Sequence, residues 1–149
     1  MAELELPRQE ALTSAFLDLS RKVEPIRRCV SALRTGRFEH PDGRIDDLGP
    51  TRISIEQAAL ISCLCRQCCR PLSVEVGFGM GSSATVILGT RSFLNQGFEH
   101  LIFDPYSVME GTGDVVQSYL VTEFGDRFRR INKPSEIHTY TLSSAEIMS

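Results

Sequence analysis

The chain has 149 residues, of which 42% are hydrophobic and 23% are charged, and its formal net charge is −3. This length suits one soluble globular domain with a real core and is too short for two. The negative balance gives no support for binding to nucleic acids or anionic membranes, which need a basic surface. The first residues lack the pattern of a secretory signal, and no apolar run approaches the length of a membrane helix. We therefore expect a cytoplasmic protein with free thiols.

The N-terminal third is expected to be mostly helical. Residues 8–34 have a helical pattern, either as one helix or as two helices broken near Pro25. Residues 40–50, rich in Pro, Gly and Asp, are expected to form a loop. We interpret residues 1–50 as an N-terminal helical cap and loop.

A cysteine-rich helix is predicted next, over about residues 54–69. Ser54 and Gln57 have the S-x-x-Q spacing of a capping box, which marks its start. Its four cysteines are Cys63, Cys65, Cys68 and Cys69. At about 100° per residue the last three share a stripe with apolar residues, whereas Cys63 lies opposite. One helix cannot direct all four sulfurs at one ion, so we predict buried small side chains rather than a metal site.

From residue 72 onward, strands and helices are expected to alternate. Strands are predicted at 72–77, 100–104 and 136–142, with helices at 82–96 and about 113–130, and a further helix begins after residue 142. Short connections between such elements favour right-handed crossovers and a parallel sheet of the α/β class.

A glycine-rich turn, "VEVGFGMG", joins the first of these strands to its helix. Gly77, Gly79 and Gly81 would let a ligand approach the backbone, beside a helix N-terminus that favours negative charge. The spacing is G-x-G-x-G, not the G-x-G-x-x-G of dinucleotide-binding proteins. Glu75 inside the strand disfavours a pyrophosphate and suits a ligand with a cationic end.

At these residues the sequence resembles the class I S-adenosylmethionine-dependent methyltransferases, whose first motif is E-x-G-x-G-x-G. "LIFDPYS" and "YTLSSAEIM" are similar to the ends of the family's second and third strands, and the resemblance spans roughly residues 50–149. The small-molecule O-methyltransferases of the catechol and macrocin type are the most similar. The resemblance implies a Rossmann-like parallel sheet in the order 3-2-1, with helices on both faces, within residues 51–149.

The resemblance also assigns site residues. The three glycines would carry the methionine part of S-adenosylmethionine, and Glu75 would orient the loop or meet the cofactor's amino group. Ser83 would hold the carboxylate, Asp104 would accept the ribose hydroxyls, and Tyr106 would flank the adenine. Ser144 and Ala145 match the turn that lines the adenine. No catalytic residue or metal ligand is assigned.

Several alternatives stay open at this stage. The family's acceptor-binding strands follow the third strand, so the chain has the extent of an N-terminal half, completed by further residues, a partner or self-association. The chain alone is expected to be marginally stable and inactive. A non-catalytic protein that binds the cofactor and, less favoured, an NAD-dependent oxidoreductase are the other readings. His40, His100 and His138 are expected to be structural or solvated, without the neighbours of a catalytic triad.

Overall fold

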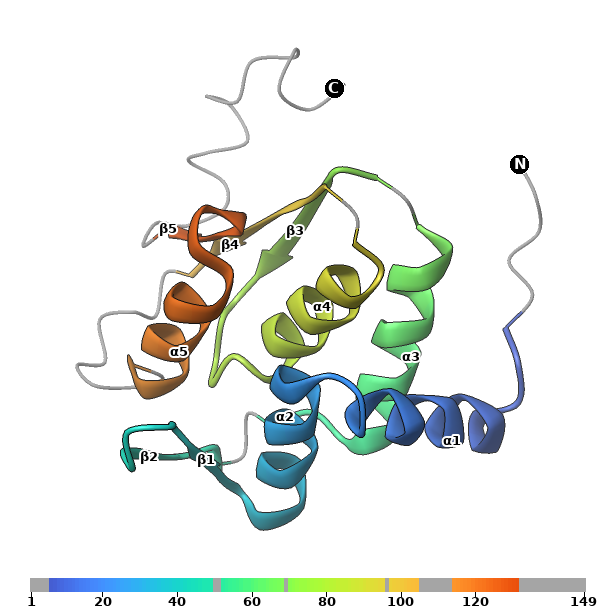
Figure 1. The fold of residues 1–149 in the computed structure, drawn as a ribbon, viewed down its shortest axis with the longest axis horizontal. Helices are drawn as coiled ribbons and strands as arrows, with labels where there is room; N and C mark the ends of the chain where they lie inside the picture. The colour runs from blue at the N-terminus through green and yellow to red at the C-terminus, as the bar shows by residue number, and fades with distance from the viewer. Residues whose placement is uncertain (1–5, 50–51, 69, 96, 105–113, 132–149) are drawn as a thin grey trace.

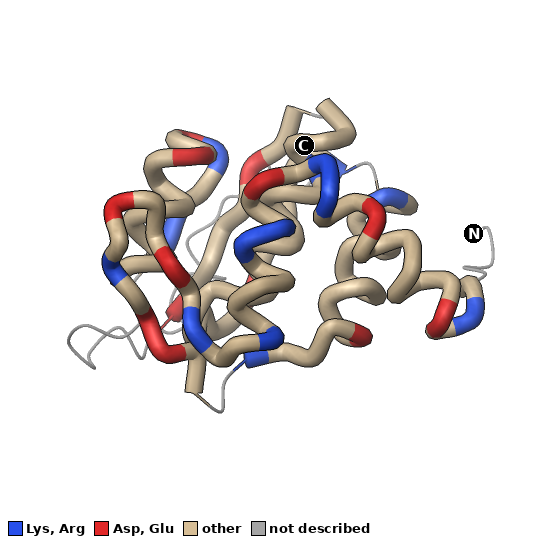
Figure 2. Tube along the Cα trace, turned by 60° about the horizontal axis from the view of Figure 1, so that its bottom comes forward, with Lys and Arg blue, Asp and Glu red and all other residues tan. Residues whose placement is uncertain are grey.

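A computed structural model describes residues 6–49, 52–68, 70–95, 97–104 and 114–131 (Figure 1). Along the chain, three helices and a small hairpin precede a parallel sheet whose strands alternate with helices. None of the described helices has the length and apolar character needed to cross a membrane. Positive and negative side chains are interspersed along the elements instead of segregating by sign (Figure 2).

Two helices, not one, form the N-terminal segment. Helix α1 spans Gln9–Ser20 and helix α2 spans Glu24–Thr35. Pro25 lies in the first turn of α2, where its missing N–H costs nothing, and Gly36 ends this helix with a left-handed backbone. The break near Pro25 is therefore confirmed, and its cause is helix initiation at this proline.

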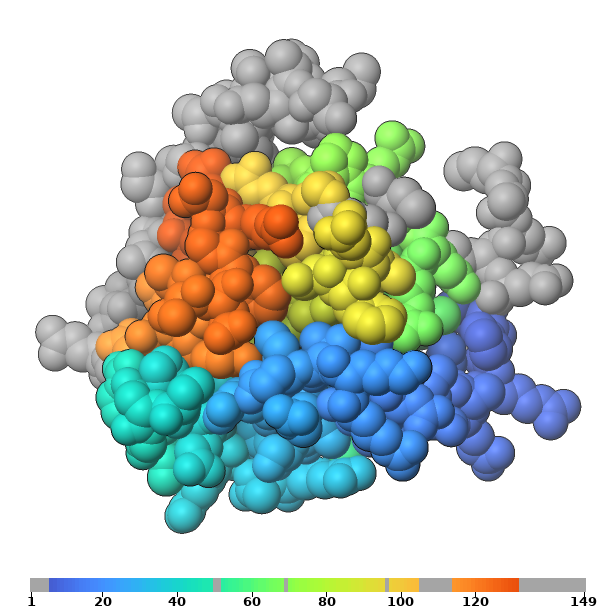
Figure 3. Space-filling view, in the orientation of Figure 1, coloured from blue at the N-terminus to red at the C-terminus, as the bar shows by residue number. Residues whose placement is uncertain are grey.

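The segment expected to be a loop, residues 40–50, contains the turn and the second strand of a small antiparallel hairpin. Strand β1 (Arg37–Glu39) pairs with strand β2 (Ile45–Asp47), and the turn between them holds the Asp-Gly pair that favours hairpins. These strands are short and mostly polar, so the alternation of apolar residues that signals a strand is missing. In Figure 3 this hairpin and α2 lie directly against α5 and α4.

Helix α3 spans Ile55–Gln67 and begins at the predicted capping box, where Ser54 and Gln57 exchange both hydrogen bonds. The prediction that its cysteines are core residues is wrong for Cys68 and only partly right for Cys63 and Cys65, and Cys69 lies outside the described residues. The buried face consists of Ala58, Ala59 and Ser62. Cys63 and Cys65 are half-buried and Cys68 is exposed beyond the last helical turn. Small residues form the contact because α3 packs against both α1 and α4.

Three parallel strands form the main sheet, in the order β3-β4-β5. Strand β3 (Leu72–Val76) is followed by helix α4 (Ser82–Phe93), and strand β4 (Glu99–Phe103) by helix α5 (Asp114–Phe124). These bounds agree with the predicted strands and helices to within a few residues, except at the end of α5. A mixed α/β architecture with a parallel sheet is therefore confirmed.

A third parallel strand lies where the sequence predicts the end of a helix. A short 3₁₀ turn, Gly125–Arg127, ends the helical segment, and strand β5 spans Phe128–Ile131 within the predicted helix. Its two central residues are arginines, so the sequence lacks the apolar alternation of a strand. Both arginines form ion pairs, Arg129 with Glu99 and Arg130 with Asp104. The strand predicted over 136–142 lies outside the described residues.

Helices α4 and α5 cover one face of the sheet and bury the main core. Ile102 and Phe128 point from this face into a cluster with Val86, Leu88 and Leu120. On the opposite face, Val74 and Val76 of β3 are 54% and 67% exposed. In the part of the chain that the structure describes, helical cover of both faces is not seen, and β3 is an edge strand.

Candidate functional site

The glycine turn after β3 has the conformation that its composition requires. Gly77, Gly79 and Gly81 have φ values of 85°, 52° and 70°, in the left-handed region that side chains disfavour. Between them, Phe78 and Met80 point into the core and are buried. A Cβ atom on Gly81 would lie 2.6 Å from the Phe78 ring. The glycines thus allow the turn to bury its two large side chains, whereas Gly77 is half-buried and Gly79 is exposed.

The turn leaves room and hydrogen-bond donors for a ligand. A Cβ atom placed on Gly77 meets no other atom within 4 Å, so the space beside this residue is open. Gly81 is the N-cap of α4, and no side chain caps this helix. The first N–H groups of a helix lack partners inside the helix and favour an anion. The start of α4 therefore offers donors to a carboxylate.

The turn and Asp104 lie side by side at the carboxyl edge of the sheet. The Gly77 N–H donates to the carbonyl oxygen of Phe103 over 2.7 Å, which places Gly77 beside the end of β4. Asp104 follows directly, and its N–H donates to the carbonyl oxygen of Ile131 at the end of β5, over 3.0 Å. The two principal candidates of the resemblance, far apart in sequence, are thus neighbours.

Asp104 is already engaged by an arginine that the sequence did not reveal as a site residue. The Arg130 guanidinium lies 2.7 Å from Asp104 Oδ2, and the two side chains are only 6% and 4% exposed. Arg130 also donates to Gln117 of α5 and lies over the Phe78 ring, with 4.5 Å from its guanidinium carbon to the ring centroid. A ribose at this position would have to share the Asp104 carboxylate with Arg130.

Glu75 lies beneath the turn, on the face of the sheet that α4 covers. Ser83, in the first turn of α4, donates its hydroxyl hydrogen to Glu75 Oε1. His100 Nε2 lies 3.1 Å from Glu75 Oε2, and His100 Nδ1 lies 3.0 Å from the Ser73 hydroxyl. The Ser83 hydroxyl hydrogen therefore points at a side chain of the protein, not into the open space.

His100 has the structural role expected of it, although a serine and a carboxylate do lie beside its ring. Its ring is fully buried between Ser73 and Glu75, as the register of β3 and β4 requires. The Ser73 hydroxyl also lies 3.3 Å from the carbonyl oxygen of Glu99. With the ring sealed from solvent, these groups form a structural hydrogen-bonded chain, not an exposed nucleophile and its base.

Three of the assigned residues, Tyr106, Ser144 and Ala145, lie outside the described residues. Within the described ranges, no three His, Cys, Asp or Glu side chains come together as a group that could hold a metal ion. A cavity of about 500 Å³ lies between α2 and the hairpin, lined by Arg28, Ser31, Thr35, Arg37, Glu39 and Ile45. None of the assigned residues lines this cavity.

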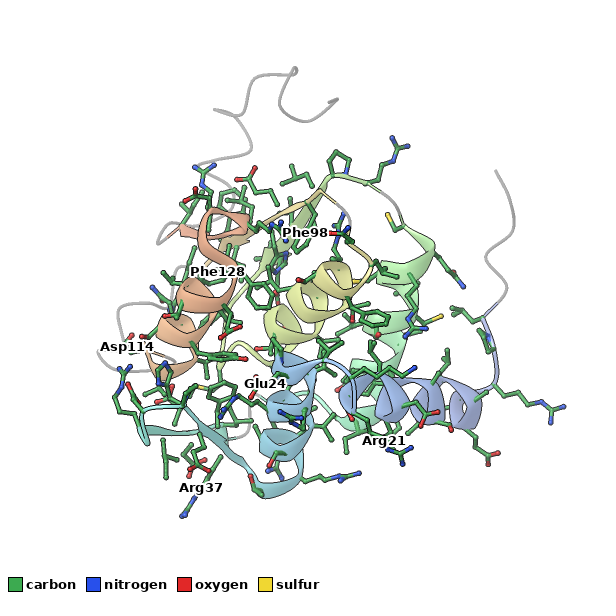
Figure 4. The ribbon with its side chains drawn as sticks, viewed as in Figure 1. Arg21, Glu24, Arg37, Phe98, Asp114 and Phe128 are labelled. Carbon is green, nitrogen blue, oxygen red and sulfur yellow. The ribbon has the colours of Figure 1, made fainter. Side chains whose placement is uncertain are left out.

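A partly buried polar contact also connects two helices near the site. Glu24, at the start of α2 in Figure 4, accepts a 2.7 Å hydrogen bond from the hydroxyl of Tyr119 in α5. Burial, followed by this carboxylate, raises the pKa of Tyr119 far above its ordinary value. The contact ties the N-terminal helices to the helix that packs beside the glycine turn.

These contacts bring together, at one edge of a parallel sheet, a glycine turn, an uncapped helix and two acids. Open backbone donors suit an anionic group, whereas Glu75 and Asp104 suit ammonium or hydroxyl donors. Comparisons with protein-family models, with curated proteins and with solved structures find no match to the chain.

Proposed function

We propose that the chain binds S-adenosylmethionine at the carboxyl edge of β3 and β4, as a class I methyltransferase acting on an oxygen of a small molecule. The observation that carries the proposal is the contact between the ends of these strands, where Gly77 lies beside Asp104. An E-x-G-x-G-x-G turn and an acid after the next strand are two features of the resemblance that are separate in sequence and adjacent in the fold.

The amino-acid end and the ribose of the cofactor have complementary groups here. The amino-acid end would lie along Gly77 and Gly79, with its carboxylate toward the uncapped start of α4. Its ammonium group would be drawn to Glu75. The ribose hydroxyls would donate to Asp104, in competition with the guanidinium of Arg130.

Bound S-adenosylmethionine would supply a methyl group on a sulfonium sulfur: the acceptor oxygen would bond to the methyl carbon as the carbon–sulfur bond breaks, S-adenosylhomocysteine would leave, and the hydroxyl proton would pass to a base or to water. The protein's main task in such a displacement is alignment of the reacting atoms. The turn is suited to this task because the buried side chains of Phe78 and Met80 anchor it to the core.

Ligand binding by the full chain tests the proposal without a known acceptor. S-adenosylhomocysteine and NAD are added separately, and thermal unfolding is followed by circular dichroism. A ligand at about 100 times its Kd stabilises the folded state by about 2.7 kcal/mol. We expect S-adenosylhomocysteine to raise the melting temperature and NAD to leave it unchanged. Stabilisation by NAD alone would assign the turn to a dinucleotide instead.

A further inference from the structure

We propose that His100 is a positioning residue: it holds Glu75 so that the glycine turn recognises the ammonium end of the cofactor. This inference rests on the proposed function and concerns a residue to which the resemblance gives no role. His100 lies on β4, one strand away from the turn, and is fully buried. Its influence on a ligand must therefore pass through Glu75.

The imidazole is fixed at both of its nitrogen atoms. Nδ1 shares a hydrogen bond with the Ser73 hydroxyl at 3.0 Å, and Nε2 faces Glu75 Oε2 at 3.1 Å. Because a carboxylate only accepts hydrogen bonds, Nε2 carries a hydrogen and donates it to Glu75. With both edges held, the ring presents this donor in one direction only.

Glu75 in turn receives one donor at each carboxylate oxygen. His100 donates to Oε2 from β4, and Ser83 donates to Oε1 from the first turn of α4. The side chain of Glu75 is 16% exposed, so its charge is mostly removed from water and depends on these donors. Together the two donors fix the position of Glu75 relative to the start of α4. The glycine turn connects these two points of the chain.

This arrangement also decides what the Ser83 hydroxyl can do for a ligand. Its hydrogen is used by Glu75, so its oxygen presents only lone pairs and can accept but not donate. A carboxylate gains nothing from such an oxygen, whereas an ammonium group gains a hydrogen-bond acceptor. Glu75 and Ser83 thus form an ammonium-selective pair, and the ligand carboxylate is left to the backbone N–H groups of α4.

Two substitutions of His100 separate its two contacts. Gln can place an amide N–H near the position of Nε2, whereas Asn reaches only the position of Nδ1 and keeps the contact with Ser73. The ligands are S-adenosylhomocysteine and its analogue that lacks the α-amino group, with both affinities measured by calorimetry on the full chain. A charge-assisted hydrogen bond corresponds to about tenfold or more in affinity.

We expect His100→Asn to bind S-adenosylhomocysteine about tenfold more weakly and the deamino analogue with unchanged affinity. His100→Gln should restore S-adenosylhomocysteine affinity to within about threefold of the wild type. A purely structural role would instead weaken both ligands together, and that result overturns the inference, as does failure of Gln to restore binding. Should His100→Asn not fold, Glu75→Gln replaces it, with the same selective loss expected.

The wild-type chain separates the inference from the proposed function. If it binds neither ligand, the proposed function is wrong and this inference is lost with it. If it binds S-adenosylhomocysteine and the deamino analogue equally, cofactor binding stands and the role of His100 in recognising the ammonium group is refuted.

Discussion

Removal of the Asp104 charge should destabilise the fold, because its ion pair with Arg130 is almost completely buried. The change is Asp104→Asn, which keeps the shape of the side chain. Breaking a buried pair by removing one partner typically costs about 3–5 kcal/mol, since the other charge remains in a poorly solvated place. Both side chains are at most 6% exposed, so screening by water is small.

The surroundings of Arg130 place the expected cost at the lower end of that range. Its guanidinium keeps the hydrogen bond to Gln117 and the contact with the Phe78 ring after the aspartate charge is gone. We therefore expect Asp104→Asn to lower the free energy of unfolding by about 3 kcal/mol. Urea unfolding followed by far-ultraviolet circular dichroism measures this quantity.

A double-mutant cycle identifies the pair as the cause. Arg130→Met replaces the guanidinium with an apolar side chain of similar length, and the double variant removes both charges. We expect the double variant to be at least about 2 kcal/mol more stable than the sum of the single effects predicts. Strict additivity, or a cost below about 1 kcal/mol for Asp104→Asn, would refute the role assigned to the buried pair.

The same variants measure the contribution of Asp104 to ligand binding. In Asp104→Asn the ligand loses a hydrogen bond to a charged acceptor, so the binding free energy of S-adenosylhomocysteine should become less favourable by about 1–3 kcal/mol. Arg130→Met keeps the acid and frees it from its competitor, so its affinity should be equal to that of the wild type or higher. Undiminished binding by Asp104→Asn would remove this residue from the site.

Three further substitutions and one control substitution test the local structure. Ser54→Ala removes the cap of α3 and should lower the free energy of unfolding by about 1 kcal/mol in urea. Gly81→Ala should lower the free energy of unfolding by about 2–5 kcal/mol, because the new Cβ atom clashes with its neighbours and the backbone is left-handed. In the control, Gly43→Ala, the backbone is also left-handed but the surrounding space is open, so the loss should be only about 1–2 kcal/mol. Burial raises the pKa of the Cys29 thiol from 9.0 to about 12, so the unfolded chain loses this proton first. The free energy of unfolding should therefore fall by about 1.4 kcal/mol per pH unit as the pH rises between those two values. The Cys29→Ala variant should not show this part of the pH dependence. At pH 8, peptide mass mapping should find exposed Cys68 alkylated and Cys29 protected.

Elements with local signals could be predicted from the sequence. The capping box at Ser54, the proline that opens α2 and the glycines after β3 each act within a few residues, and all of them have the expected local structure. The helical phase of α3 could not be predicted in the same way. Its buried face is chosen by two partner helices that need small residues at the contact, and a count of apolar residues favours the cysteine side instead.

Strand β5 and the hairpin were missed because their polar residues are satisfied by distant partners. Arg129 and Arg130 resemble the solvated end of a helix until Glu99 and Asp104 are known to lie on the neighbouring strand and at its end. An isolated arginine in a strand is unfavourable, but two arginines diagonal to two acids on or directly after the neighbouring strand are not. The information needed to place β5 therefore lies about 30 residues away in the chain.

The chain of polar groups around His100 depends on a single fact that the sequence does not contain, the register of β3 against β4. Leu72 pairs with Glu99, so Ser73 lies opposite His100, and Glu75 lies two residues farther along the same face. Directly opposite and diagonal side chains of paired strands are within reach of each other. A shift of one residue would turn His100 to the other face, where Val74 is exposed, and leave Glu75 buried without this donor. The register that completes the core thus also brings together the hydrogen-bonded groups beneath the glycine turn. Any change in the pairing of β3 with β4 should therefore displace Glu75 and alter the candidate site.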